Sequence, residues 1–185
     1  MGTVIVAQFV TLDGVVEDPD GHGGTPFGGW AMRYGPEGVA GDKFRLGTVM
    51  QDGVLLLGRR TWDQFTQLWP KRDAPFARLM NLAEKAVVTR RPLPTDLWSN
   101  SRAVEGPLEA WVAHTSATQD IAVIGSQSVA RILREADLVD EYRLLTFPIW
   151  SGSGRRLFDD TVVPLSLASV EHVGPATLTI HDARP

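Results

Sequence analysis

Four short apolar runs limit what this chain can fold into. They are rich in Val, Ile, Leu and Ala, and they lie at Val4 to Val10, Val54 to Leu57, Ala86 to Thr89 and Ile121 to Ile124. Polar residues hardly alternate with the apolar ones, so each run predicts a strand that is covered on both faces. Strands of this kind form parallel or mixed sheets with helices on both sides. The runs therefore predict an α/β fold.

Helical patterns fill the intervals between these runs. Thr61 precedes Gln64 at the spacing of a capping box, which predicts a helix beginning there. Pro107 and Ser126 each precede a stretch in which apolar residues recur every three or four positions. A further helix is expected from Pro36 to about Met50, on the same periodicity. The helices would supply the two outer layers of the fold.

The C-terminal part has a different pattern. Tyr142 to Ile149 reads as another strand, and Leu165 to Val173 and Thr177 to Asp182 flank a Gly174-Pro175 turn, which predicts a hairpin. Gly21 to Gly35 is rich in glycine and is expected to be a long surface loop. We predict a three-layer α/β sandwich whose mixed, mostly parallel central sheet ends in an antiparallel hairpin. The length of 185 residues fits a single domain over residues 1–185.

Composition removes several classes of function. Lys and Arg total 18 against 22 Asp and Glu, a net charge of -4, so no overall field attracts nucleic acid. The chain has no cysteine, and its four histidines are scattered without ligand spacing, so we expect no metal site. No P-loop and no G-x-S-x-G elbow is present. No stretch is apolar enough for a membrane span and the N-terminus reads as a strand, so a cytoplasmic location is expected.

The ends of three predicted strands carry cations and small polar residues. They are Gly58-Arg59-Arg60-Thr61, Thr89-Arg90-Arg91 and Gly125-Ser126-Gln127-Ser128. Ligands of open α/β sheets collect at the carboxyl ends of the strands. Arginine and the first turn of a helix both bind phosphate well. This pattern predicts a local anion site, although either arginine pair alone could simply be solvated.

Three other residues are candidates for contact with a substrate. On the predicted helix from Pro36 to Met50, Asp42 falls within the apolar stripe, where burial would favour a protonated carboxyl that can donate a proton. It could equally complement the helix dipole near the first turn. Asp13-Gly14 after the first strand is either a simple turn or a ligand contact. Trp30, like Phe27, could stack on a planar ligand or pin the loop to the core.

At these residues the chain resembles the dihydrofolate reductase fold family, and more closely its bacterial branch related to the riboflavin-pathway (pyrimidine) reductase domain. The matching pieces span most of the chain in the family's order: VTLDGVVE, LLLGRRTW, KAVVTRR, IAVIGSQSVARIL and LVDEYRLLTFPIWSGSGRRLF. G-R-x-T-W followed by I-G-x-x-x-V is a fairly specific combination. The resemblance implies the dihydrofolate reductase-like fold and a reductase that takes hydride from NADPH.

The resemblance also implies roles for individual residues. In the family, the G-R-x-T and I-G-G segments hold the cofactor phosphates and the V-T-R segment lies beside the 2′-phosphate. The matching residues here are Gly58, Arg59, Arg60, Thr61, Thr89, Arg90, Gly125, Ser126, Gln127 and Ser128. Ser126 replaces the second glycine of I-G-G. Counting back from Trp62 by the interval seen in folate reducers gives Asp42, and Asp13-Gly14 matches an L-D-G element of the riboflavin branch.

The sequence thus predicts a cytoplasmic, NADPH-dependent reductase of a small pterin-like or ribosylated pyrimidine-like heterocycle. Asp42 would act as the acid, Asp13 would bind substrate and Trp30 would cover it. Relatives form dimers, so a homodimer is expected, without nucleic-acid or membrane partners. Two alternatives remain: a non-catalytic NADP(H)-binding module on the same scaffold, and a protein that carries or uses flavin.

Overall fold

The computed structural model describes residues 1–158 and 162–184. Its strands form one eight-stranded sheet in the order β4-β3-β2-β5-β1-β6-β8-β7. Strand β2 pairs parallel with β3 and β5, β3 pairs parallel with β4, and β8 pairs antiparallel with both β6 and β7. The predicted fold class is confirmed, because the sheet is mixed and ends in an antiparallel hairpin. No helix in the described ranges is long and apolar enough to cross a membrane.

The chain divides into two compact units, which are described separately. The first contains residues 1–6 and 45–140, and the second contains residues 7–44 and those from 141 onward. Strand β1 (Val4–Thr11) contributes to both units. That residues 1–185 form a single domain stays a prediction.

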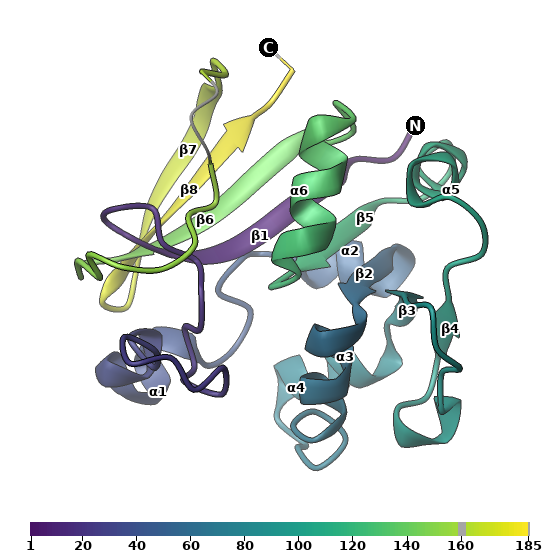
Figure 1. The fold of residues 1–185 in the computed structure, drawn as a ribbon, viewed down its shortest axis with the longest axis horizontal. Coiled ribbons are helices and arrows are strands. Elements are labelled where there is room, and N and C mark those ends of the chain that lie inside the picture. The colour runs from purple at the N-terminus through teal and green to yellow at the C-terminus, as the bar shows by residue number, and fades with distance from the viewer. Residues whose placement is uncertain (159–161, 185) are drawn as a thin grey trace. The chain divides into compact units, whose positions relative to one another are not determined.

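The first unit is a parallel sheet between helices. Its strands are β2 (Val54–Gly58), β3 (Glu84–Val88), β4 (Ser101–Ala103) and β5 (Ile121–Ile124). Its helices are α2 (Gly47–Asp52), α3 (Arg59–Thr66), α4 (Pro75–Leu82), α5 (Leu108–Thr115) and α6 (Gln127–Glu135), with a 3-10 turn at Thr95–Leu97. Figure 1 shows α6 in front of the strands and α2 behind them, so both faces are covered. This explains why β2 and β5 are almost entirely apolar.

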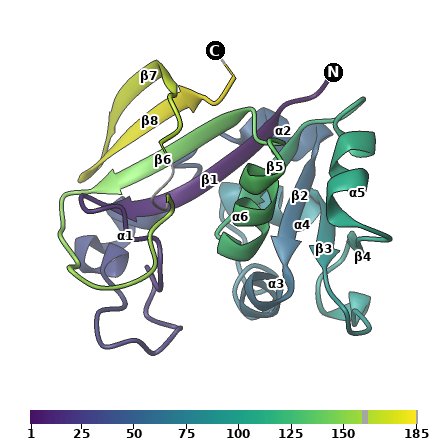
Figure 2. The same ribbon diagram turned by 45° about the horizontal axis from the view of Figure 1, so that its top comes forward.

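The second unit is built on the antiparallel strands. These are β6 (Glu141–Phe147), β7 (Ser166–Val173) and β8 (Ala176–Asp182), preceded in the chain by a 3-10 turn (Ala31–Tyr34) and α1 (Gly35–Val39). Figures 1 and 2 show β8 between its two neighbours, as the pairing requires. Phe147 lies at the centre of the core, where the rings of Phe9, Trp30 and Tyr34 pack against it. The predicted hairpin is confirmed.

The predicted helix from Pro36 to Met50 is wrong. Helix α1 ends at Val39, α2 begins at Gly47, and residues 40–46 between them are not helical. Gly41 and Arg45 adopt φ angles of 81° and 58°, which a right-handed helix cannot contain. The helical-wheel argument for Asp42 therefore fails, because this residue lies half-buried in the connecting segment.

The predicted capping box at Thr61 is also wrong. Helix α3 begins at Arg59, directly after β2, and Gly58 is its N-cap residue with extended backbone angles. Thr61 is therefore already inside the first turn. Two elements have no counterpart among the predictions, the short edge strand β4 and helix α4, whose sequence PFARLMNL lies in a segment without an obvious cap.

Candidate functional site

A cavity lined by arginines lies at the carboxyl end of β3. Its volume is about 520 Å³, and its lining residues are Arg59, Val88, Thr89, Arg90, Arg91, Val104, Gly106 and Leu108. Arginines that follow two different strands thus meet at one hollow, as the strand-end pattern predicts. A guanidinium cluster above an apolar floor suits a ligand that joins a phosphate to a flat ring.

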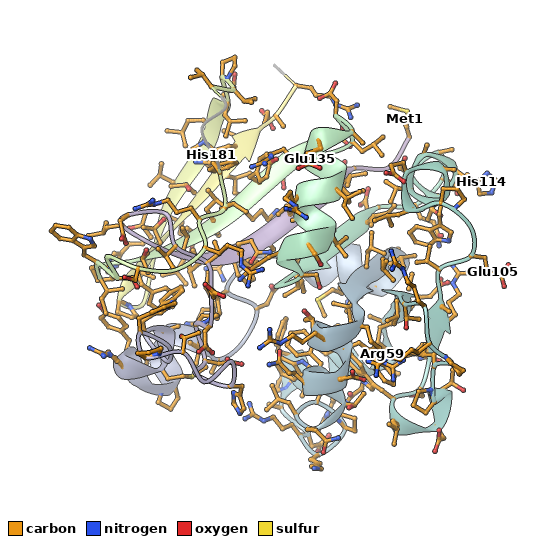
Figure 3. All side chains as sticks on the ribbon, in the orientation of Figure 1. Met1, Arg59, Glu105, His114, Glu135 and His181 are labelled. Atoms are coloured by element: carbon orange, nitrogen blue, oxygen red, sulfur yellow. The ribbon has the colours of Figure 1, made fainter. Side chains whose placement is uncertain are left out.

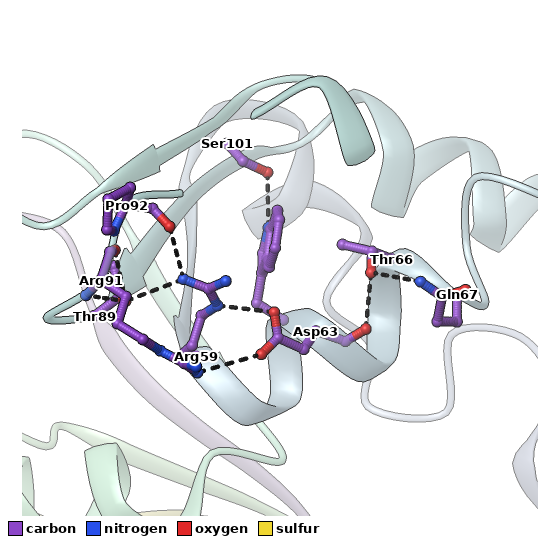
Figure 4. Close-up of polar contacts among 9 residues, drawn as sticks. Arg59, Asp63, Thr66, Gln67, Thr89, Arg91, Pro92 and Ser101 are labelled. Carbon is purple, nitrogen blue, oxygen red and sulfur yellow. Dashed lines mark hydrogen bonds and ion pairs between the residues drawn. The ribbon is translucent and has the colours of Figure 1, made fainter. Parts of the chain in front are cut away.

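Arg59 is held in place by its neighbours. Its Nε donates to Asp63 Oδ1 at 2.8 Å, and its Nη1 donates to the Pro92 carbonyl oxygen at 2.9 Å. The guanidinium also lies 5.5 Å from the ring centre of Trp62. Figure 4 shows how these contacts draw Arg59 from α3 toward the segment after β3, and Figure 3 labels it within the whole chain. Arg59 is therefore oriented before any ligand binds.

The two arginines that follow β3 have fewer contacts than Arg59. Arg91 is exposed, and its Nη2 lies 4.0 Å from Asp63 Oδ2. Arg90 is exposed, and it forms no ion pair or side-chain hydrogen bond with the residues that the structure describes. Thr89 Oγ1 accepts a hydrogen bond from the Arg91 amide at 3.1 Å, which shapes the turn that carries both. Arg90 thus lines the cavity as a cation without a partner among the residues that the structure describes.

The carboxyl ends of β2 and β5 are joined by a side chain. The Gly58 amide donates to Ser126 Oγ at 2.8 Å. Gly125, with a φ angle of 66°, turns the chain into α6, and a Cβ built on it would lie 3.7 Å from Thr61 Cγ2. Helices α3 and α6 therefore begin beside each other, each without a side-chain cap. Their first backbone N–H groups give this region a partial positive charge.

Most residues predicted for cofactor binding are thus brought together. Arg59, Thr89 and Arg90 line the cavity, while Gly58, Thr61, Gly125 and Ser126 surround the neighbouring strand ends. Gln127 and Ser128 are the first two residues of α6. Arg60 is exposed and does not line the cavity. That any of them binds a cofactor stays a prediction.

The strand-end pattern included Arg91, which lines the cavity, although the family resemblance gave a role to Arg90 alone of that pair. The sequence reasoning missed Asp63, which fixes Arg59. The four-residue separation of Arg59 and Asp63 on one helix is a local signal that could have revealed the pair.

In the second unit, Asp13 anchors a loop. Its carboxylate accepts hydrogen bonds from Thr11 Oγ1 at 2.5 Å and from the Ser151 and Gly152 amides at 3.1 and 2.8 Å. Partial burial favours the neutral form, but these hydrogen bonds outweigh it and lower the pKa of Asp13 to about 2. Asp13 is therefore ionised near neutral pH. It can accept hydrogen bonds but cannot serve as a proton donor.

Trp30 lies in the core of the second unit. Its side chain is 1% exposed, its indole Nε1 donates to the Glu17 carbonyl oxygen at 2.9 Å, and its ring meets Phe147 edge to face. These contacts favour the role of pinning the glycine-rich loop. Stacking on a ligand stays a prediction and would require the indole to become exposed.

A buried carboxylate that the sequence reasoning overlooked organises the same loop. Asp18 accepts hydrogen bonds from the Gly23 amide at 2.6 Å and from the Thr25 amide and hydroxyl at 2.9 and 2.8 Å. A Cβ built on Gly28 would lie 2.1 Å from Asp18 Oδ2, so this position needs glycine. The loop is folded around a carboxylate, and no local pattern distinguishes Asp18 from the nearby Asp20.

No group of three or more metal-binding side chains occurs within residues 1–158 and 162–184.

The sheet order and the cation-lined strand ends define an α/β protein with the dihydrofolate reductase-like fold. The model of the RibD C-terminal domain family matches residues 2–179, and the chain belongs to this family. The family predicted from sequence resemblance is thereby confirmed.

Solved structures of two other proteins share this fold. A solved structure from Shewanella sp. PV-4, described as that of a riboflavin biosynthesis protein, is 20% identical, with each chain covered to 99% and a TM-score of 0.70. A pyrimidine reductase-like protein from Corynebacterium diphtheriae is 13% identical over 100% of this chain and 92% of its own, with a TM-score of 0.64.

Two further relatives differ in length and in how they are described. Acinetobacter baumannii RibD is 16% identical with a TM-score of 0.62, and the match covers 100% of this chain but 59% of that one. The Bacillus subtilis (strain 168) protein YyaP, described as uncharacterized, is 26% identical over 175 residues, covering 90% of this chain and 86% of YyaP.

Proposed function

We propose that this protein is an NADPH-dependent reductase of a small heterocyclic substrate, pterin-like or ribosylated pyrimidine-like. The observation that carries the proposal is the arginine-lined cavity of about 520 Å³ beside the carboxyl ends of β2 and β3. Membership of the RibD C-terminal domain family and the similarity to reductase-like proteins support it.

The cavity would hold the adenosine end of NADPH. Arg90 and Arg91 would pair with the 2′-phosphate, with Arg59 held beside them by Asp63, and Val88 and Leu108 would contact the adenine ring. The cofactor's diphosphate would bind where α3 and α6 begin, since the N-cap residues Gly58 and Ser126 make no side-chain cap hydrogen bond. Because NADH lacks the 2′-phosphate, the arginines should favour NADPH.

The cofactor would supply a hydride, and the chain must supply binding, orientation and a route for a proton. We assign the proton to Asp42, directly or through water, because ionised Asp13 cannot donate one. Asp13 would accept a hydrogen bond from the substrate at Oδ2, which also accepts the Gly152 amide. The Trp30 side chain, which lies under the glycine-rich loop, would cover the substrate. The working form would be a homodimer.

A non-catalytic module that binds NADP(H) is the second candidate. The ionised state of Asp13 favours it, because this carboxylate offers no proton for reduction. The two candidates share the cofactor site and differ in turnover, whereas a flavin carrier would bind FMN or FAD more tightly than NADPH.

The decisive experiment compares cofactors on one variant. Arg90→Ala should weaken NADPH binding about 10-fold, the low end for a hydrogen bond to a charged group, while NADH binding changes little. Arg60→Ala should weaken the binding of NADPH and the binding of NADH by the same factor, since Arg60 does not line the cavity that would hold the 2′-phosphate. The matched control is Arg78→Ala, an exposed arginine that pairs with Asp73. Calorimetric titration gives the dissociation constants, and equal losses of NADPH and NADH in Arg90→Ala would refute the 2′-phosphate assignment.

A further inference from the structure

Two buried side-chain nitrogen atoms have no hydrogen-bond partner among residues 1–158 and 162–184. They are Gln8 Nε2 and Trp69 Nε1. Trp69 is half-buried, and its ring packs edge to face with Phe65 and Phe76. Gln8 is 3% exposed, and its Oε1 makes no hydrogen bond within those ranges either. Exchanging the two ends of the Gln8 carboxamide would therefore leave it equally unpaired.

The unpaired carboxamide lies in an otherwise apolar row of β1. The ring of Phe9 packs against Phe44 and Phe147. Because successive side chains of a strand point to opposite faces, Gln8 points away from these rings, to the face that it shares with Val6 and Val10. The two valines offer it no polar side chain. A buried amide without a partner destabilises the fold relative to an apolar residue of the same size.

The place of Gln8 in the fold is that of a ligand contact. It lies three residues before β1 ends at Thr11. It also belongs to the same unit as Asp13 and Trp30, the residues proposed to contact the substrate. Ligands of open α/β sheets bind at the carboxyl ends of the strands. A buried polar group that the fold leaves unpaired needs an explanation, and binding of a ligand supplies one here.

The chemistry of the carboxamide indicates what such a ligand must offer. Gln8 carries two N–H donors beside one carbonyl acceptor. A phosphate or carboxylate would accept from the donors and leave Oε1 unpaired. A ring that presents a carbonyl oxygen next to an N–H, which is an amide or lactam edge, would pair with both ends at once. The unpaired atoms therefore favour a neutral amide edge over an anion.

We propose that Gln8 is a specificity-determining residue, whose carboxamide pairs with an amide edge of the bound ring. The inference rests on the proposed function and narrows its substrate class to heterocycles that carry a carbonyl group next to an N–H. Pterin and uracil rings both have this edge. The carboxamide of the nicotinamide ring in NADPH has the same chemistry, so the test must separate the cofactor from the substrate.

The first measurement is thermal stability. Gln8→Met keeps the length of the side chain without its polar atoms, so the unfolding midpoint should rise by about 2 to 4 °C when the unpaired donor is removed. Asn81→Leu should lower the midpoint, because Asn81 Nδ2 donates to the Trp69 carbonyl oxygen at 3.0 Å and its Oδ1 accepts Trp98 Nε1 at 2.8 Å. Gln51→Met, at an exposed glutamine, should leave the midpoint unchanged.

The second measurement is calorimetric titration of the wild type, Gln8→Met and Gln51→Met. The ligands are NADPH, adenosine 2′,5′-bisphosphate, and pterin or uridine 5′-monophosphate added to protein saturated with NADP⁺. In Gln8→Met the dissociation constant of the ligand that pairs with the carboxamide should rise about 5- to 10-fold, while that of adenosine 2′,5′-bisphosphate, which has no amide edge, stays within about 2-fold. Loss of NADPH affinity identifies the nicotinamide as the partner, and loss of heterocycle affinity alone identifies the substrate.

Each outcome decides the proposal. A higher midpoint together with selective loss of one amide-bearing ligand in Gln8→Met supports it. If Gln8→Met fails to fold or has a lower midpoint, the carboxamide has a structural role and the proposal is overturned. It is also overturned if no ligand loses affinity, although NADPH binding by the wild type would still support the proposed function. If the wild type does not bind NADPH, the proposed function fails and the role of Gln8 fails with it.

Discussion

Lys85 should make the stability of this protein rise in mildly alkaline solution. The residue lies in β3 with 0% of its surface exposed. Its Nζ donates to the carbonyl oxygens of Met80, Asn81 and Ala83 at 3.0, 3.0 and 2.6 Å, at the C-terminal end of α4, and lies 4.5 Å from the ring centre of Trp98. The ammonium thus fastens α4 to the strand that ends at the arginine cavity.

The magnitude follows from the cost of burying this charge. Burial lowers the pKa of Lys85 from 10.5 to about 8. At about 1.4 kcal/mol for each tenfold change in acidity, the charged form in the folded chain costs about 3 kcal/mol. Between these two pKa values the unfolded chain binds more protons than the folded one, so the free energy of unfolding rises with pH across this window. Below pH 8 the cost is fully present.

Urea unfolding of the wild type and of Lys85→Met, followed by circular dichroism, measures this contribution. Methionine does not titrate, so the difference in unfolding free energy between the two proteins should shift by about 3 kcal/mol in favour of the wild type from pH 7 to pH 10.5. The control is Lys71→Met, because Lys71 is exposed and its difference should stay constant. A difference for Lys85→Met that varies by less than about 1 kcal/mol would refute the reasoning.

Two further predictions concern the proposed substrate residues. The pKa of Asp13 is about 2 in the folded chain against 3.8 in the unfolded one, so its stabilising effect is present above pH 4 and is lost as pH falls toward 2. The stability difference between wild type and Asp13→Asn should shrink over that range, and a difference independent of pH would contradict the anchoring role. If Asp42 is the proton donor, Asp42→Asn should slow NADPH oxidation with a dihydropterin about 100-fold while NADPH affinity is unchanged. An unaltered rate would remove Asp42 from the mechanism, and Asp96→Asn, at an exposed carboxylate, serves as the control.

The amino-acid sequence by itself determined the strands and the class of fold. Runs such as Val54 to Leu57 and Ile121 to Ile124 consist of apolar side chains, most of them branched, which are stable only when both faces of the strand are covered. They therefore form buried strands, and their composition alone predicts this. The order of strands and helices then limits the topology to a few arrangements. Residues that follow parallel strands meet at one edge, and this is why the arginine cluster could be expected from the sequence.

Helix boundaries were harder to predict from the sequence, because the backbone angles of a single residue can end a helix that the apolar periodicity would continue. The apolar repeat from Val39 to Met50 has helical spacing, yet Gly41 and Arg45 take left-handed backbone angles and divide the segment. Arginine pays a steric cost for this conformation, which tertiary packing must offset. A local pattern contains no information about that packing.

Only the tertiary structure decided what each polar side chain does. Arg59 is fixed by Asp63 and Pro92, whereas Arg90 lines the same cavity without an ion pair to any residue in the described part of the chain, although both arginines follow a strand. Ser126 stands where a serine would cap its own helix, but its hydroxyl bonds to Gly58, which is remote in sequence. Apolar burial depends on the average pattern of a segment, which sequence displays. Hydrogen bonding between remote residues depends on donor–acceptor distances of about 3 Å that tolerate only a few tenths of an ångström, and this geometry exists only once the chain has folded.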